Sequence, residues 1–254
     1  MKDPFRLDGK VAIITGSSRG IGRSIAETMA RLGAKVVVSS RKAEPCQEVA
    51  AAIKAEGGDA MVIPCNIGRK DEVEALVAKT KAAWGQIDIL VCNAAVNPAY
   101  GPMGDLTDEA FDKIMGSNVK SNLWLCNLVM PGMAERGGGA VVIISSIAGL
   151  RASPMLGGYG ISKAADFALA RNLAVEWGPK NVRINCIAPG LVKTDFAKAL
   201  WEDEAAVKRR NAITPLRRIG EPDEIGPVAA FLAAPASSFI TGQVIVADGG
   251  VTIA

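Results

Sequence analysis

Seven short apolar runs, rich in valine and isoleucine, alternate along the chain with longer segments whose apolar residues recur at helical spacing. The runs are nearly continuous in apolar character, which is typical of strands buried on both faces of a sheet. This alternation predicts an α/β fold, a doubly wound parallel sheet of seven strands with helices on both faces. The predicted strands are 10–15, 34–40, 60–66, 87–93, 140–146, 182–189 and 243–248.

Helical periodicity fills the intervals between these strands. Thr107 is placed to cap one predicted helix, and Gly33, Gly57 and Gly85 are placed to end three others. The predicted helices span about 21–32, 45–56, 71–84, 107–135, 159–177 and 222–233.

No repeat, low-complexity tract or linker divides the 254 residues, so we predict a single domain over 1–254. The least regular stretch is about 191–221, between the sixth strand and the last helix. Insertions of that length in a compact domain are often lids or binding loops, and we expect a substrate lid here.

The composition excludes several kinds of chemistry. Histidine is absent, which rules out a Ser-His-Asp triad, a histidine acid or base, and a histidine-ligated zinc. Proton transfer must then use Tyr, Lys, Asp, Glu or Cys. The net charge of +3 is scattered without a basic stripe, so neither nucleic acid nor an anionic membrane is expected as a partner.

Cysteine usage and the chain ends bear on the compartment. The cysteines are far apart, form no CxxC pair and mostly lie in apolar runs, so we expect buried free thiols in a reducing compartment. No secretory signal opens the chain, no apolar stretch approaches ~20 residues, and the terminal VTIA is no peroxisomal signal. We expect a soluble, cytoplasmic protein. The five cysteines are Cys46, Cys65, Cys92, Cys126 and Cys186.

Small and polar residues follow five of the apolar runs at their carboxyl ends, where open parallel sheets bind ligands. In the first such segment, Gly16, Gly20 and Gly22 let the backbone approach a pyrophosphate beside a helix N-terminus. Taken alone, this segment also fits a glycine turn. The five segments are TGSSRGIG (15–22), SSRK (39–42), CNAAVNP (92–98), SSIAG (145–149) and APGLVKT (188–194).

The segment YGISK places Tyr159 and Lys163 four residues apart, on one face of a predicted helix. A nearby ammonium favours the phenolate and lowers the tyrosine pKa from ~10, which would suit acid-base catalysis. Taken alone, the pair also fits a surface contact with no task.

With these motifs in order from about residue 7 to ADGG (247–250), the sequence resembles the short-chain dehydrogenase/reductase family. The resemblance implies a single-domain Rossmann fold and an oxidoreductase that needs no metal. It implies that Tyr159 is the general acid/base, that Lys163 lowers the tyrosine pKa and holds the nicotinamide ribose, and that Ser146 hydrogen-bonds the substrate carbonyl. Asn118 in GSNVK resembles the residue that positions a water joining the lysine to solvent. Spacing and strand alternation favour Ser146 over Ser145.

The cofactor expected from the resemblance is NADP(H). Ser40 stands where NAD-specific members place an acidic residue, and Arg41 and Arg19 are placed to bind a 2′-phosphate. The alternative is that these cations are only solvated loop residues. The remaining expected cofactor contacts are Gly16, Ser18, Gly20, Ile21, Gly22, Lys42, Asn66, Ile67, Asn93, Ala94, Ala95, Tyr159, Lys163, Pro189, Gly190, Val192 and Thr194.

Two positions depart from the family pattern. Asn66 replaces a common Asp at the adenine, and Val96 replaces a common Gly. The segment NAAVNP (93–98), which contains Val96, resembles the same segment in one subgroup of the family, the NADP-dependent carbonyl and retinol reductases of the peroxisomal type.

Apolar residues near the strand ends indicate that the substrate is a ketone or aldehyde with a hydrophobic body. Because cells usually keep NADP in its reduced form, the resemblance implies that the enzyme works in the direction of carbonyl reduction. Phe196 and Trp201 lie at helical spacing and fit an anchor for the lid or for an interface equally well. The expected substrate contacts are Val96, Leu191, Phe196 and Trp201, with Pro98, Tyr100, Ala148, Leu150, Leu156 and Leu200 as further candidates.

Two other functions stay open. The basic run KRRNAITPLRR (208–218) could meet an acidic carrier protein or a CoA phosphate, which would make the protein a 3-oxoacyl-thioester reductase. A nucleotide-sensing protein without turnover could use the same fold. The resemblance further implies a homotetramer or homodimer, formed through helices 107–135 and 159–177 and the last strand and helix.

Overall fold

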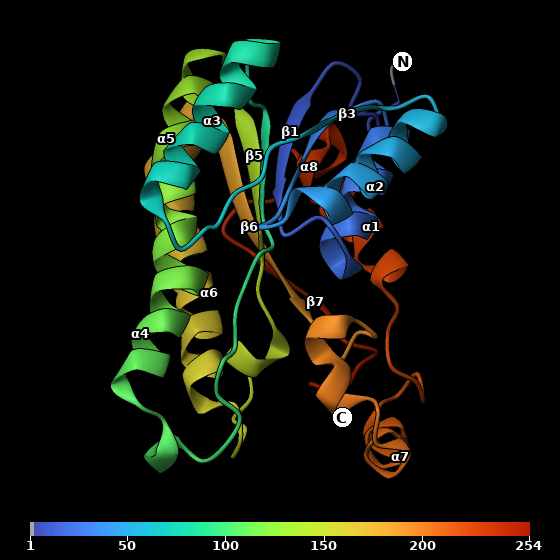
Figure 1. The fold of residues 1–254 in the computed structure, drawn as a ribbon. Coiled ribbons are helices and arrows are strands. Elements are labelled where there is room, and N and C mark those ends of the chain that lie inside the picture. Colours follow the sequence, from blue (N-terminus) through green and yellow to red (C-terminus); the bar gives the residue numbers. More distant parts are fainter. Residues whose placement is uncertain (1–2) are drawn as a thin grey trace.

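The predicted apolar runs form seven parallel strands of one sheet in the computed structural model, which describes residues 3–254 (Figure 1). Residues 1–2 of the predicted domain lie outside the described range. The strand order is β3-β2-β1-β4-β5-β6-β7, as in a doubly wound sheet, and confirms the predicted fold class. The strands are β1 Val11–Thr15, β2 Lys35–Ser39, β3 Asp59–Val62, β4 Ile89–Cys92, β5 Gly139–Ile144, β6 Val182–Pro189 and β7 Val244–Ala247.

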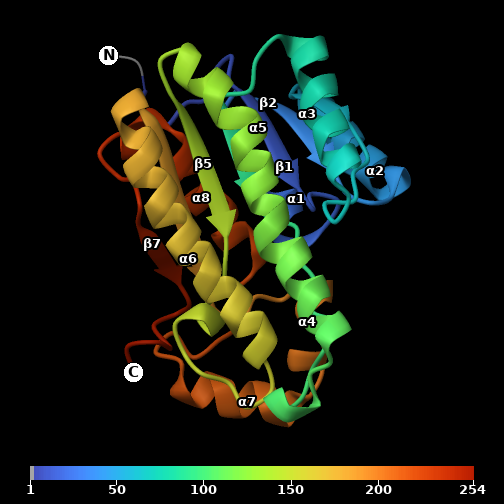
Figure 2. The ribbon, with the colours of Figure 1, turned by 90° about the vertical axis from the view of Figure 1, so that its left-hand side faces the viewer.

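Helices cover both faces of this sheet. In Figures 1 and 2, α1, α2 and α8 lie against one face, and α3, α5 and α6 against the other. The helices are α1 Gly20–Arg31, α2 Ala43–Ala55, α3 Lys70–Trp84, α4 Asp108–Met115, α5 Ser121–Glu135, α6 Gly157–Trp177, α7 Glu204–Ile213 and α8 Gly226–Ala233. None of the described helices is long and apolar enough to cross a membrane.

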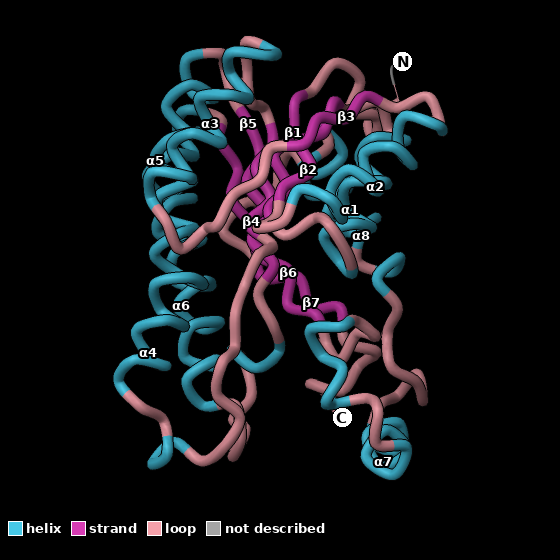
Figure 3. Tube along the Cα trace, in the orientation of Figure 1, coloured by secondary structure: helices cyan, strands magenta, loops and turns pink. Residues whose placement is uncertain are grey.

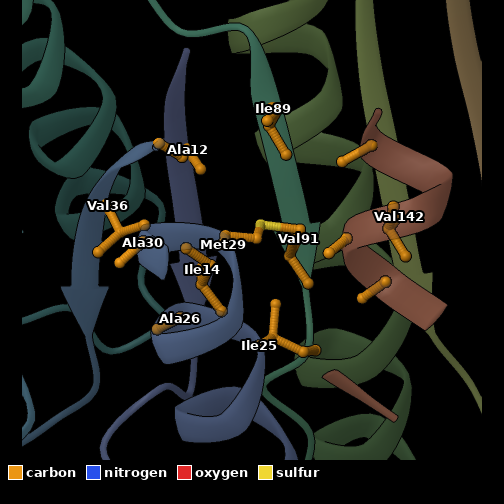
Figure 4. Close-up of a cluster of buried hydrophobic side chains, with 14 of the residues drawn as sticks. Ala12, Ile14, Ile25, Ala26, Met29, Ala30, Val36, Ile89, Val91 and Val142 are labelled. Atoms are coloured by element: carbon orange, nitrogen blue, oxygen red, sulfur yellow. The ribbon is translucent and has the colours of Figure 1, made fainter. Parts of the chain in front are cut away.

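The core explains why the strands read as continuous apolar runs. Ile14 packs with Met29 and Val91 on the α1 face (Figure 4), whereas its neighbour Ile13 belongs to the cluster on the α5 face with Leu125. Successive residues of a strand point to opposite faces, so most positions of a doubly covered strand are apolar. All five cysteines are buried and free in this core, as expected.

Local signals placed most helix ends correctly. The Thr107 side chain accepts a hydrogen bond from the N–H of Ala110 and so caps α4. Gly33, Gly57 and Gly85 have φ angles of 98°, 84° and 75° at the ends of three helices, in the left-handed region that favours glycine.

Two expectations were wrong in detail. The predicted helix 107–135 is interrupted by a π-helical turn at Gly116–Lys120, between α4 and α5. The stretch 191–221 is less irregular than expected, because it contains a short 3₁₀ helix at Asp195–Leu200 and the ten-residue α7. Asp203 caps α7 by accepting hydrogen bonds from the N–H groups of Ala205 and Ala206.

The strand order reverses between β1 and β4, and this positions the site. The chain leaves β3 at one edge and returns to β4 on the other side of β1. The carboxyl ends of the strands point to the end of the molecule where Figure 3 shows long loops, α4 and α7. The stretch 191–221 lies at this end of the molecule, and its role as a lid stays a prediction.

Candidate active site

The loop between β1 and α1 is shaped to bind an anion. Gly16 and Gly20 have φ angles of 66° and 56°, and a Cβ on Gly22 would collide with the carbonyl oxygen of Gly16. Arg19 precedes the helix, and no side chain caps the first N–H groups of α1. A tight glycine turn followed by free N–H groups at the positive end of a helix dipole suits the phosphates of a dinucleotide.

Asn93, at the end of β4, holds this loop in place. Its Nδ2 donates to the carbonyl oxygens of Thr15 and Gly16 at 2.9 and 3.1 Å. The Thr15 hydroxyl oxygen accepts from the N–H groups of Asn93 and Ala94 at 3.0 and 3.1 Å. The side chain of Asn93 is therefore directed at the protein, where it joins two of the expected cofactor segments.

Asn118 lies in the π-helical turn and clamps the segment after β4. Its Oδ1 accepts from the N–H of Val96 at 2.8 Å, and its Nδ2 donates to the Val96 carbonyl at 2.9 Å. The same Nδ2 lies 3.1 Å from the hydroxyl of Ser162 on α6. The extra residue of the turn thus brings Asn118 between the cofactor segment and α6.

The two serines after β5 have different surroundings. Ser145 is buried, and its hydroxyl donates to the carbonyl of Lys163 at 2.8 Å. Ser146 is partly exposed, and its Oγ accepts from the N–H of Ala148 at 3.1 Å. Ser145 therefore serves the packing of α6, while the Ser146 hydroxyl keeps its proton for another acceptor.

Tyr159 and Lys163 lie on α6, and the Lys163 Nζ is 5.7 Å from the centre of the Tyr159 ring. Lys163 is fully buried; its Nζ donates to the carbonyl of Ile144 at 2.9 Å and to Oδ2 of Asp166 at 3.1 Å. Burial lowers the pKa of this lysine, but the charges of Asp166 and Tyr159 outweigh burial and leave the pKa above its ordinary value.

Asp166 and Asn122 are residues of this site that the sequence analysis did not single out. Asp166 is buried, and burial raises its pKa, while Lys163 and the amide of Asn122 oppose the rise. A signal was present in the sequence, because Asp166 follows Lys163 by three residues and so shares its helix face.

The expected 2′-phosphate residues lie in loops with few partners. The Ser40 hydroxyl donates to the Lys42 carbonyl and shares a hydrogen bond with the thiol of Cys46. Arg41 and Lys42 are exposed, and no ion pair involves either within residues 3–254. Arg19 pairs with Asp195 of the lid, with its Nη1 3.0 Å from Oδ2.

The other expected cofactor residues line the same strand ends. The Oδ1 of Asn66 accepts a hydrogen bond from the N–H of Gly68. A Cβ on Gly20 would lie 3.1 Å from the Thr194 side chain, so residue 194 of the lid packs close to the glycine loop. Ser18, Ile21, Ala94, Ala95 and Gly190 are partly exposed, whereas Ile67, Pro189 and Val192 are buried.

The expected substrate residues separate into two groups. Phe196 is 55% exposed and its ring centre lies 6.1 Å from that of Tyr159, so it is placed to meet a substrate. Trp201 instead donates its Nε1 proton to the Thr194 carbonyl at 2.8 Å and braces the lid. Val96 and Leu191 are partly buried at the carboxyl ends of β4 and β6.

Comparison with known proteins identifies the family. A family model described as "Enoyl-(Acyl carrier protein) reductase" matches residues 16–252. Dehydrogenase/reductase SDR family member 4 from Bos taurus is 44% identical over 244 residues, 96% of this chain and 88% of the bovine protein. The Oryctolagus cuniculus protein of the same name is 45% identical over 249 residues, 98% of this chain and 95% of its own. The chain belongs to the short-chain dehydrogenase/reductase (SDR) family. This confirms both the family and the subgroup expected from the motifs.

Solved SDR structures share the whole fold. A 7α-hydroxysteroid dehydrogenase complexed with NADH and 7-oxo glycochenodeoxycholic acid superposes with a TM-score of 0.94 at 39% identity, covering 98% of this chain and 97% of that one. A gluconate 5-dehydrogenase from Burkholderia cenocepacia, in complex with NADP and tartrate, has a TM-score of 0.95 at 33% identity, covering 99% and 98%. The SDR chain described here is thus an NAD(P)-dependent oxidoreductase acting on CH–OH or carbonyl groups, and the alternative of a sensor without turnover falls away.

Proposed function

We propose that this SDR enzyme uses NADP(H) to reduce the carbonyl group of a small hydrophobic ketone or aldehyde, with Tyr159 as the general acid. The observation that carries the proposal is the placement of Tyr159 beside a buried lysine, at the strand ends where the glycine loop lies. The related structures contain NADH in one case and NADP in the other, so the choice of cofactor rests on this chain's own residues.

In the proposed reaction the protein manages one proton and the position of the carbonyl. The Ser146 hydroxyl donates a hydrogen bond to the carbonyl oxygen, and the Tyr159 hydroxyl gives its proton to that oxygen as the alcohol forms. The Lys163 ammonium stabilises the phenolate that remains. The nicotinamide, when bound, supplies the hydride.

The glycine loop and α1 would hold the pyrophosphate, because the turn admits no Cβ at Gly22 and the first N–H groups of α1 have no side-chain cap. Asn66 and Ile67 lie where the adenine is expected. Asn93 would hold the glycine loop in position through its hydrogen bond to Thr15. Asn118 would hold the segment after β4 through its hydrogen bond to Val96.

The preference for NADP rests on the end of β2. Ser40 offers no negative charge there, and the neighbouring Arg41 and Lys42 are exposed cations without a carboxylate partner in the described part of the chain. A 2′-phosphate would give them that partner through charge-assisted hydrogen bonds. Arg19 would also bind the 2′-phosphate, after its ion pair with Asp195 has broken.

A free hydrophobic substrate fits the lid better than a carrier-bound thioester does. The exposed ring of Phe196 beside Tyr159 offers an apolar contact. Several cations of the lid are already paired with carboxylates in the lid or next to it, which leaves fewer cations for an acidic carrier. These pairs are Lys198 with Glu202, Arg209 with Asp203, and Arg218 with Glu224.

Exposed apolar side chains support assembly into a homotetramer, or a homodimer if one interface is used. Leu123 on α5 and Val175 on α6 mark one face, while Phe239 and Val246 mark another at β7. A molar mass of one chain, measured by light scattering on the purified protein, would contradict this assembly. The buried free thiols support a reducing compartment such as the cytoplasm, which imaging of a tagged protein in its native cells would test.

The function is tested by screening carbonyl compounds, including 3-oxoacyl-CoA thioesters, for NADPH oxidation. We expect hydrophobic ketones or aldehydes to turn over, with kcat/KM at least about tenfold higher for NADPH than for NADH. Tyr159→Phe should lower kcat by about 10²- to 10⁴-fold while NADPH still binds. Equal use of NADH would contradict the cofactor assignment, and full activity of Tyr159→Phe would contradict the mechanism.

A further inference from the structure

A buried carboxylate lies inside the site, and the mechanism above does not use it. Asp166 is completely buried on α6, and its Oδ2 is 3.1 Å from Nζ of Lys163. Aspartate is rarely buried to this extent unless it is paired, because removing a charge from water is costly. Its partner here is the lysine on which Tyr159 depends.

Asn122 on α5 fixes the second oxygen of this carboxylate. Its Nδ2 donates to Oδ1 of Asp166 at 3.0 Å and to the carbonyl of Asn118 at 2.6 Å. The amide nitrogen of Asn122 carries two protons, so it can donate both hydrogen bonds at once. Because both acceptors face the nitrogen, the amide cannot be turned to place its oxygen there. Side-chain contacts therefore connect Asn118, Asn122, Asp166 and Lys163.

The other groups around the pair do not replace the carboxylate. The Lys163 Nζ has one further acceptor, the neutral carbonyl of Ile144. The Cys186 thiol on β6 donates to the Asp166 carbonyl at 3.4 Å, and burial raises the pKa of Cys186, so this thiol stays neutral. The remaining titratable groups nearby are Tyr159 and Arg171 on α6, Cys126 on α5 and Cys92 on β4.

We propose that Asp166 is a positioning residue that keeps Lys163 charged and holds its ammonium beside Tyr159, with Asn122 orienting the carboxylate. The proposal rests on the proposed function in that Tyr159 is taken as the proton donor. Without the carboxylate, a fully buried ammonium would keep only the Ile144 carbonyl and would lose its proton. A neutral lysine no longer favours the phenolate, so Tyr159 would hold its proton to higher pH.

The chain offers a direct measurement of this effect, because Tyr100 and Tyr159 are its only tyrosines. In a Tyr100→Phe background, the near-ultraviolet absorbance of tyrosinate reports the ionisation of Tyr159 alone, without any substrate. Asp166→Asn removes the charge and keeps the shape. We expect it to raise the midpoint of the Tyr159 titration measurably above that of the Tyr100→Phe parent.

Glu176→Gln is the matched control, since it removes one carboxylate from the exposed end of the same helix and should leave the midpoint unchanged. An unchanged midpoint in folded Asp166→Asn would overturn the proposal. A lower midpoint would overturn it too, because Lys163 would then stay charged without its partner.

A second variant covers the case in which Asp166→Asn does not fold. Asn122→Leu keeps both charges and removes the amide that orients the carboxylate, so the Tyr159 midpoint should rise by a smaller amount. A wild-type midpoint in folded Asn122→Leu would contradict the proposal. Failure of the proposed function shows separately, as wild-type protein that reduces no carbonyl, while the titration remains readable.

Discussion

Two ion pairs of almost equal length lie among the residues of the candidate site. The Lys163–Asp166 pair has an N–O distance of 3.1 Å and side chains 2% and 0% exposed. The Arg19–Asp195 pair measures 3.0 Å, with side chains 67% and 62% exposed. Because water screens the second pair and not the first, the same distance describes a fixed element in one case and an exchangeable contact in the other.

The surroundings of the two pairs extend this contrast. The floor of the site, formed by α5 and α6, satisfies the polar atoms of Asn118, Asn122 and Asp166 within the protein. The lid carries exposed pairs such as Lys198–Glu202. A floor of this kind holds Tyr159, the proposed proton donor, in one geometry, whereas exposed contacts of the lid can be replaced by contacts to a ligand.

The largest effect should follow from breaking the buried pair. Asp166→Ala leaves Lys163 uncompensated, and we expect it to lower the free energy of unfolding by about 3–5 kcal/mol at neutral pH. Urea unfolding measures this. The double variant Lys163→Met/Asp166→Leu should recover most of the loss, since it removes both charges. If Asp166→Ala were as stable as the wild type, the contrast between floor and lid would fail.

A smaller effect is expected at the cation of the exposed pair. Arg19→Ala removes the proposed contact to the 2′-phosphate, so the Kd for NADPH should rise about tenfold or more while the Kd for NADH changes little. Fluorescence titration with both cofactors measures the difference. Arg23→Ala, which removes an exposed cation one turn along α1, is the control and should leave both values near wild type. A parallel rise for NADH would assign Arg19 to the shared pyrophosphate instead.

The carboxylate partner gives an effect of the opposite sign. Asp195→Asn frees Arg19 from a surface pair worth about 0.2–1 kcal/mol, so NADPH should bind up to about fivefold more tightly. The same titration, repeated at high salt, should show a smaller gain because salt already weakens the pair. Weaker NADPH binding in this variant would mean that Asp195 supports the phosphate site rather than competing with it.

The smallest effect is expected at the other end of the lid. A hydrogen bond and charge from Arg218 lower the pKa of Glu224 to about 2. A lowered folded-state pKa stabilises the protein above the unfolded value of about 4.3, and the gain is lost as the pH falls toward 2. Glu224→Gln should therefore cost less than about 1 kcal/mol near pH 7, and the difference in Tm from wild type should shrink below about pH 4. A constant difference across this range would assign the loss to packing.

The sequence predicted what depends on local pattern. Apolar runs such as 10–15 and 182–189 are strands because both faces are covered, and Gly85 ends α3 because its φ of 75° suits glycine. The ends of these runs also marked the site, since parallel strands bring their carboxyl ends to one edge.

The features that it missed depend on partners far along the chain. The π-helical turn inserts a residue so that Asn118 meets Val96, 22 positions away, and Asn122 reaches Asp166 across 44 positions. Helix α7 was missed because half of its residues are polar and none is buried, which leaves no clear apolar period to detect. Its start depends on the Asp203 cap.

The Arg19–Asp195 contact also joins two equilibria. In the proposed function, a 2′-phosphate and Asp195 would compete for the guanidinium of Arg19, and competition for a shared group is reciprocal. The factor by which the lid contact weakens NADPH binding is the factor by which bound NADPH loosens the lid. NADH, which lacks the phosphate, leaves the contact in place. If Arg19 binds the 2′-phosphate as proposed, the choice of cofactor and the freedom of residues 191–221 to move are set by the same coupling free energy.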